Sequence, residues 1–197
     1  MKKKVMLVSF VLILAIISIF CILNYRSAAR DINQAINRPG LLPVNIIYEQ
    51  KVSKGSMVFG ITSDGNAKGL FAAAVKKNIF GYTAIYSGVQ GDIKTTIDKV
   101  GLTESYFPSI NKLTSPMFYG IIGNSEIKKV KIIEKKRNIE AEAKIIDANG
   151  YRLWLMNMDK FQGSQFDIIG LTADDKEISH RKDNIAPWTV EQKPFKM

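Results

Sequence analysis

An uncharged apolar run near the N-terminus constrains this chain more than any other feature. Residues 5–25 read VMLVSFVLILAIISIFCILNY, and the only polar members of the run are Ser9, Ser18, Asn24 and Tyr25. As an α-helix the run would extend about 31 Å, which is close to the hydrocarbon thickness of a bilayer. The run therefore predicts one transmembrane signal-anchor helix that contacts membrane lipid.

A cleaved secretory signal is the alternative interpretation of this run. Ser27-Ala28-Ala29 offers a small-residue cleavage site, so cleavage after Ala29 would release a secreted protein. The apolar segment of such signals usually has about 7–15 residues, and the longer run here favours a retained helix. A lipoprotein signal is disfavoured because Cys21 follows the bulky Phe20.

Charge does not by itself orient the helix. Three lysines, Lys2 to Lys4, precede the run, and Arg26, Arg30 and Arg38 follow it. Moving three adjacent lysines through a bilayer is costly, whereas long domains are translocated with little regard to their charge. We therefore expect residues 1–4 to form a cytoplasmic stub and the rest to lie outside the cell membrane. Any signalling would then require a membrane-protein partner.

Composition narrows the chemistry of the exported part. Residues 31–197 carry 23 basic and 18 acidic residues, a mild excess that suits anionic lipid headgroups or an anionic envelope polymer. The one cysteine lies in the apolar run, and His180 is the one histidine. Disulfides, a cysteine nucleophile and zinc sites built on several cysteines or histidines are therefore excluded beyond the run, and no cofactor or metal is expected.

The remaining sequence predicts one β-rich domain. We expect a polar stalk over residues 26–40, an extracytoplasmic domain over 41–182 and an irregular tail over 183–197. Short runs with period-two patterning, separated by turn residues, predict nine strands: 44–50, 56–62, 69–77, 80–88, 117–123, 130–135, 139–146, 151–157 and 166–172.

These strands favour a mainly β fold, an antiparallel meander that forms a sandwich or a curled sheet. In IEAEAKII (139–146), Ile139 and the alternate residues after it share one face, as expected of a half-buried strand. Residues 93–100 predict a short helix, and residues 102–115 predict a loop.

The strongest local bias is KKVKIIEKKR, residues 128–137. On an extended strand Lys129, Lys131, Lys135 and Arg137 would share a face and form a basic ridge suited to phosphate groups. The competing interpretation is neutralisation by Glu134, Glu140 and Glu142 on or beside the same hairpin. Nucleic acid is not an expected partner, because no aromatic stacking run accompanies these lysines.

Three weaker constellations suggest other chemistry. Phe80, Tyr82 and Tyr86 are spaced to line one face of a strand, where they would form core or hold a sugar or peptide. Asp64-Gly65-Asn66 and Asp147-Ala148-Asn149-Gly150 offer oxygen ligands for calcium but are also typical turn sequences. His180 could act as a base for Ser179, although no nucleophile-elbow motif supports this.

Three phrases carry a resemblance: KKNIFGYTAIYSG, MFYGIIGNSEIKKVKI and GYRLWLM. They resemble small membrane-anchored or exported proteins of Bacillus-type Gram-positive bacteria. The resemblance covers roughly residues 44–180. It implies a location and a style of fold, and it carries over no functional residues.

The sequence therefore leads to two hypotheses. The first is a non-catalytic, membrane-tethered extracytoplasmic interaction domain that binds a membrane-protein partner or an anionic envelope polymer. The second is an exported carboxylate-dependent hydrolase that acts on an envelope polymer, with Asp92, Asp98 and Glu104 as its candidate residues. Two carboxylates that face each other across a pocket would favour the hydrolase.

Overall fold

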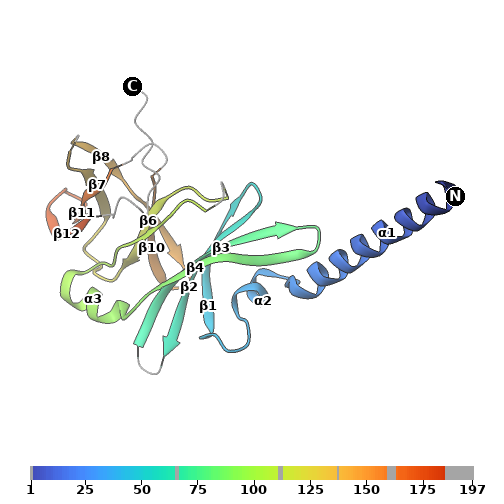
Figure 1. The fold of residues 1–197 in the computed structure, drawn as a ribbon. Coiled ribbons are helices and arrows are strands. Elements are labelled where there is room, and N and C mark those ends of the chain that lie inside the picture. Colours follow the sequence, from blue (N-terminus) through green and yellow to red (C-terminus); the bar gives the residue numbers. More distant parts are fainter. Residues whose placement is uncertain (1, 65–66, 111–112, 137, 159–162, 185–197) are drawn as a thin grey trace.

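Three antiparallel sheets follow the N-terminal helix in the computed structural model (Figure 1). The structure describes residues 2–64, 67–110, 113–136, 138–158 and 163–184, without the side chains of residues 2–8, 24, 26, 27, 64 and 184. Its elements are α1 (Lys2–Ser27), α2 (Ile32–Ile36), β1 (Val44–Val52), β2 (Gly55–Asp64), β3 (Ala67–Asn78), β4 (Gly81–Gln90), α3 (Ile93–Val100), β5 (Ser105–Phe107), β6 (Met117–Ile122), β7 (Lys129–Glu134), β8 (Ile139–Glu142), β9 (Lys144–Ala148), β10 (Tyr151–Asn157), β11 (Gln165–Leu171) and β12 (Glu177–Asn184).

The N-terminal sheet, β1-β2-β3-β4, is the predicted meander. Its strands pair in sequence order, and Val52 opposite Gly55 and Asn78 opposite Gly81 close turns of two residues. The other two sheets are antiparallel but are not meanders: the central sheet has the order β5-β6-β10-β9, and the C-terminal sheet has the order β12-β11-β7-β8. The prediction of a mainly β, antiparallel fold is confirmed, whereas the single meander is replaced by three sheets.

The central sheet is buried on both faces, between the other two sheets. Successive residues of a strand point to opposite faces, so a strand covered on both sides needs an unbroken apolar run. One face of β6 and β10 packs against the N-terminal sheet through Met117, Tyr119, Ile121, Leu153 and Leu155. The other face packs against the C-terminal sheet through Phe118, Ile122, Trp154 and Met156.

The predicted strand over 139–146 is divided between two sheets. Its first half, β8, pairs with β7, and its second half, β9, pairs with β10. The switch occurs at Ala143, whose backbone N–H donates to the Val130 carbonyl at 2.8 Å. The predicted face is confirmed, because Ile139, Ala141, Ala143 and Ile145 all join the core between the central and C-terminal sheets. Residues 139–148 therefore link those two sheets covalently.

Residues of the expected stalk pack on the outer face of the N-terminal sheet. Ala35 and Ile36 of α2 are buried against Val58, Phe71 and other residues of β2 and β3. Asp31 caps α2, its side chain accepting a hydrogen bond from Gln34 N at 2.8 Å. The structure thus differs from the expectation of a stalk ending at Gly40, because packing against the domain begins near Ala29.

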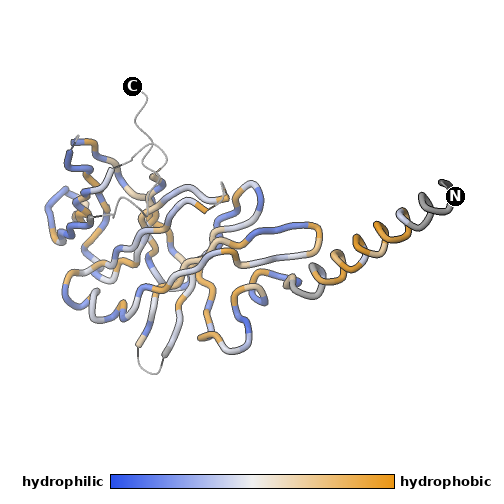
Figure 2. The backbone as a smooth tube through the Cα atoms, viewed as in Figure 1, coloured by the Kyte–Doolittle hydropathy of each residue, from blue (hydrophilic) through white to orange (hydrophobic). Residues whose placement is uncertain are grey.

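Helix α1 projects away from the sheets (Figure 2). From Ser9 to Leu23 every side chain except half-buried Cys21 is exposed, and the apolar ones lie on all sides of the helix. Ser18 satisfies its hydroxyl within the helix by donating to the Leu14 carbonyl at 2.8 Å. Within the residues whose side chains are described, no helix is both long and apolar enough to cross a membrane.

Two further elements depart from the sequence analysis, while α3 matches the predicted helix over 93–100. The predicted loop over 102–115 contains the short strand β5. The tail expected from Asp183 begins inside β12, and its residues 185–197 lie outside the described residues.

A close backbone contact joins the segment after α3 to the central sheet. The Thr103 carbonyl accepts a hydrogen bond from the buried Trp154 indole at 2.9 Å, and the Thr103 hydroxyl accepts one from Ile121 N at 2.9 Å. A Cβ atom added to Gly120 would lie 1.9 Å from the Thr103 carbonyl oxygen. Glycine at position 120 therefore permits the approach that satisfies the buried indole N–H.

We predict that Gly120→Ala destabilises the domain by about 3 kcal/mol, because the added methyl group overlaps backbone that cannot move without breaking the Trp154 hydrogen bond. Urea unfolding of the detergent-solubilised full chain, followed by circular dichroism, measures the effect. Gly88→Ala on β4 is the matched control, since no atom of the described residues lies within 4 Å of its added Cβ. Equal stabilities for the two variants would contradict this account of Gly120.

Candidate functional site

The predicted basic ridge lies on the solvent-facing side of the C-terminal sheet. Lys129 and Lys131 alternate with buried residues along β7, and the exposed Lys135 follows that strand directly. Arg137, the fourth predicted member, lies outside the described residues. The three described lysines therefore form one row, as the strand periodicity predicts.

Each lysine of this row has a carboxylate partner. Lys129 Nζ lies 2.8 Å from Asp175, Lys131 Nζ lies 3.4 Å from Glu140, and Lys135 Nζ lies 3.1 Å from Asp167. The hydrogen bond to Asp175 raises the pKa of Lys129. The competing interpretation predicted neutralisation by Glu134, Glu140 and Glu142. Glu140 pairs with Lys131 and the charge of Glu142 also raises the pKa of Lys129, whereas Glu134 is buried on the opposite side of β7. The row therefore belongs to a face with charges of both signs.

His180 lies on this same charged face. Its Nε2 atom is 3.1 Å from Asp167 Oδ1, and its Nδ1 atom is 3.2 Å from Glu177 Oε1. Burial opposes ionisation of Asp167, but hydrogen bonds and charge from His180 and Lys135 outweigh it and lower the pKa of this carboxyl. Both ring nitrogens of His180 are thus occupied by carboxylates, which makes His180 a bridge between β11 and β12.

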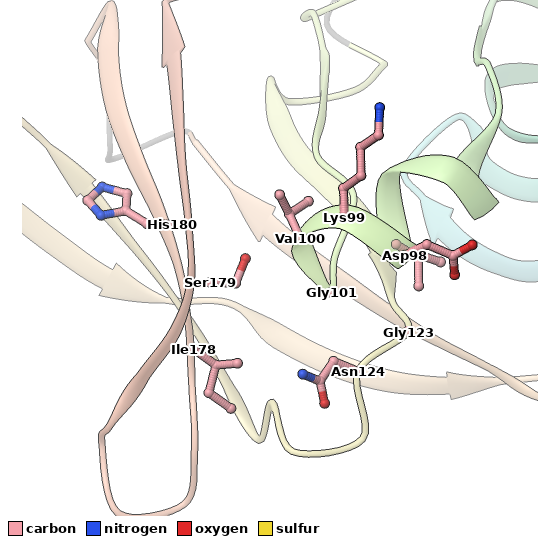
Figure 3. Close-up of a pocket in the computed structure, with 10 residues that line it drawn as sticks. Asp98, Lys99, Val100, Gly101, Gly123, Asn124, Ile178, Ser179 and His180 are labelled. Carbon is pink, nitrogen blue, oxygen red and sulfur yellow. The ribbon is translucent and has the colours of Figure 1, made fainter.

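A pocket of about 420 Å³ lies behind this face, between the end of α3 and β12 (Figure 3). Ser179 is 5% exposed, and its hydroxyl has no hydrogen-bond partner among the described residues. The Ser179 side chain points toward α3, whereas the His180 ring points to the other side of β12. The hypothesis that His180 acts as a base for Ser179 is therefore wrong, because successive residues of a strand face opposite ways.

The three candidate carboxylates of the hydrolase hypothesis are held apart by separate structural roles. Asp92 caps α3 by accepting hydrogen bonds from the Thr95 hydroxyl and backbone, which lower its pKa. Asp98 lines the pocket and pairs with Lys94 at 2.9 Å. No second carboxylate lines this pocket within the described part of the chain.

Glu104 is the most buried of the three, with 11% of its side chain exposed. Arg181 on β12 donates to both of its carboxylate oxygens at 2.6–3.0 Å, and this bond raises the pKa of Arg181. The Glu104 carbonyl accepts a hydrogen bond from the Gln90 side chain on β4 at 2.7 Å. Glu104 therefore connects the C-terminal sheet to the N-terminal sheet.

The proposed calcium ligands have a conformational explanation. Asn149 and Gly150 have φ values of +47° and +83° and form the two-residue turn between β9 and β10. This is the conformation that Asn-Gly pairs favour in hairpins. In the Asp64-Gly65-Asn66 sequence, residues 65 and 66 and the Asp64 side chain lie outside the described part. Among described residues, no group of three His, Cys, Asp or Glu side chains could hold a metal.

The predicted aromatic face on β4 is divided by a β-bulge. Ala84 pairs with Val75 and Tyr86 pairs with Ala74, which leaves Ile85 as an extra residue. Tyr82 consequently packs on the outer face of the N-terminal sheet, whereas Tyr86 packs edge-on against Phe107 on the inner side. The prediction of one face shared by Tyr82 and Tyr86 is wrong, because a bulge changes the alternation.

Sequence reasoning about local motifs missed a basic end on the N-terminal sheet. Residues 44–90 contain five lysines but only two acidic residues, Glu49 and Asp64. Four of these lysines flank two neighbouring turns: Lys51 and Lys54 at β1–β2, and Lys76 and Lys77 at β3–β4. Lys77 N donates to the Lys54 carbonyl at 3.0 Å, which holds the turns together. The uneven distribution of acidic residues along the sequence was the available signal.

No family model, curated protein or solved structure matches this chain. The resemblance to Bacillus-type membrane-anchored proteins accordingly stays a prediction. Three described features bear on function: an apolar helix, a basic end of the N-terminal sheet beside it, and a charge-balanced face on the C-terminal sheet.

We predict that a polyanion distinguishes the two groups of lysines. Replacing Lys129, Lys131 and Lys135 with Gln should change the affinity of the full chain for inorganic polyphosphate by no more than about twofold, because exposed cations already paired with carboxylates contribute little. The matched replacement of Lys51, Lys54 and Lys77 should weaken binding by roughly tenfold.

Anisotropy of labelled polyphosphate at low ionic strength measures both affinities. A larger loss from the first set of substitutions would restore the predicted ridge as a phosphate-binding site.

Proposed function

We propose that this chain is a membrane-tethered extracytoplasmic interaction domain, in which α1 spans the cell membrane and the β-sheets bind a partner protein. The all-round apolar surface of α1 carries the proposal. A helix that is apolar on every side is stable when it is buried in a core or in lipid, and the described side chains from Ser9 to Leu23 are not covered by the domain. The sequence continues without charge to Val5 and Tyr25.

The junction between α1 and the sheets supports a tether that holds the domain close. Ala29 and Tyr82 exchange two backbone hydrogen bonds of 2.9 and 2.8 Å, only two residues after α1 ends. A Cβ atom on Gly81 would lie 2.3 Å from the Ala29 carbonyl oxygen, so glycine allows this approach. The short connection limits how far the domain can move from the membrane surface.

The charged face of the C-terminal sheet supports a protein partner over an anionic envelope polymer. On this face the lysine row alternates with Glu140, Asp167 and Asp175, so the local field has both signs. A protein surface that carries charges of both signs can be complementary to this face, whereas the carboxylates would repel a uniform polyanion. Figure 1 shows the C-terminal sheet on the side of the domain away from α1, where a partner could reach it.

The proposed location places residues 1–4 in the cytoplasm and the sheets outside. It predicts that the chain in bacterial membranes resists extraction by alkaline carbonate, and that protease added to intact protoplasts digests the domain. Replacing Leu14 and Ile17 with Arg should release the chain into the soluble fraction, since each arginine at the centre of a span costs about 3 kcal/mol.

The double variant Leu14→Ile, Ile17→Leu is the matched control and should remain in the membrane. Extraction of the unmodified chain by carbonate would contradict the tether. A protected domain in intact protoplasts would instead contradict the orientation.

A further inference from the structure

The β3–β4 turn presents bare apolar surface at its tip. Ile79 is 93% exposed, and the partly exposed Phe80 follows it. The Asn78 side chain accepts hydrogen bonds from Phe80 N at 2.9 Å and from Gly81 N at 3.2 Å, which fixes the conformation of the turn. A large aliphatic side chain held in this way has no role in packing the domain.

Lysines surround this tip. Lys76 and Lys77 precede it on β3, and the neighbouring β1–β2 turn adds Lys51 and Lys54. Lys77 Nζ lies 5.4 Å from the centre of the Tyr82 ring, a cation–π contact that keeps the ammonium group beside the hairpin. Glu49 on β1, which accepts a hydrogen bond from Ser56, is one acidic residue near these four lysines, and the sequence contains none between Asp64 and Asp92.

Helix α1 leaves the domain at the same place. Tyr82, which pairs with Ala29, lies directly across from Lys77 near the closed end of the hairpin. Figure 1 shows the tip of the β3–β4 hairpin on the side of the domain from which α1 projects. If α1 enters a bilayer, as the proposed function requires, the tip is brought to the same surface.

We propose that the β3–β4 turn is a second membrane contact, which inserts Ile79 and Phe80 into the headgroup region of an anionic phospholipid bilayer. The four lysines bind lipid phosphates, while the two apolar side chains leave water. This inference rests on the proposed function, because α1 delivers the turn to the bilayer. Together, the helix and the turn fix the orientation of the domain, which a single tether would leave free to swing.

Depth-sensitive labelling of the full chain tests the proposal. Cys21→Ser removes the native thiol, and Ile79→Cys then carries an environment-sensitive nitrobenzoxadiazole label. The matched control places the label at Lys99→Cys, an exposed position on α3, which lies on the opposite side of the domain from α1. Both proteins are reconstituted in vesicles of phosphatidylcholine and phosphatidylglycerol, with or without a lipid that carries a nitroxide on its headgroup.

The label at position 79 should emit at shorter wavelength and lose most of its emission to the nitroxide lipid, whereas the label at position 99 should show neither change. Replacing Lys51, Lys54, Lys76 and Lys77 with Gln should reduce the quenching at position 79. If the chain floats with the vesicles but position 79 behaves like position 99, the second contact is overturned and the tether stands. Quenching at both positions also overturns it, and failure to float overturns tether and contact together.

Discussion

Burial of the central sheet on both faces is the constraint on which the rest of this structure depends. It requires a continuous apolar run in β6 and in the middle of β10, from Leu153 to Met156, and it leaves these side chains buried. It also explains why Gly120 and Trp154 meet the Thr103 backbone so closely, since polar backbone inside such a layer must find partners within the protein.

Sequence patterning predicted the strands and turns well where local chemistry alone determines the structure. The alternation over 139–146 and the turn at Asn149-Gly150 reflect local chemistry, and both match the structure. The switch of sheets at Ala143 and the bulge at Ile85 depend on what packs against the strand, so no local pattern encodes them. Strand β12 reads EISHRKDN and lacks an apolar alternation, and two of its side chains form ion pairs: His180 with Asp167 on β11, and Arg181 with Glu104, which precedes β5.

The candidate site was predictable in part for the same reason. Periodicity placed Lys129, Lys131 and Lys135 in one row, and proximity in sequence suggested Glu140 as a partner. The other two partners, Asp167 and Asp175, come from segments more than thirty residues away and reach the row only through the pairing of β7 with β11. The charge balance of this face depends on which strands are neighbours in the sheet, and the sequence did not predict that β11 pairs with β7.

The molecule has two ends with different electrostatics. The end of the N-terminal sheet beside α1 carries a cluster of lysines and an exposed isoleucine, whereas the face of the C-terminal sheet carries paired charges. A cluster of lysines suits anionic lipid, whereas a face with charges of both signs suits a protein partner. Under the proposed function, the first end would be held against a membrane and the second end would face a partner protein.

Neutron reflectometry of the full chain in a supported bilayer that contains phosphatidylglycerol tests this arrangement most directly. The profile of protein density along the membrane normal distinguishes a seated domain from one on a free tether. We predict protein density that continues from the headgroup layer without a water-filled gap. A hydrated layer between headgroups and domain, or the absence of protein density from the hydrocarbon region, would contradict the account.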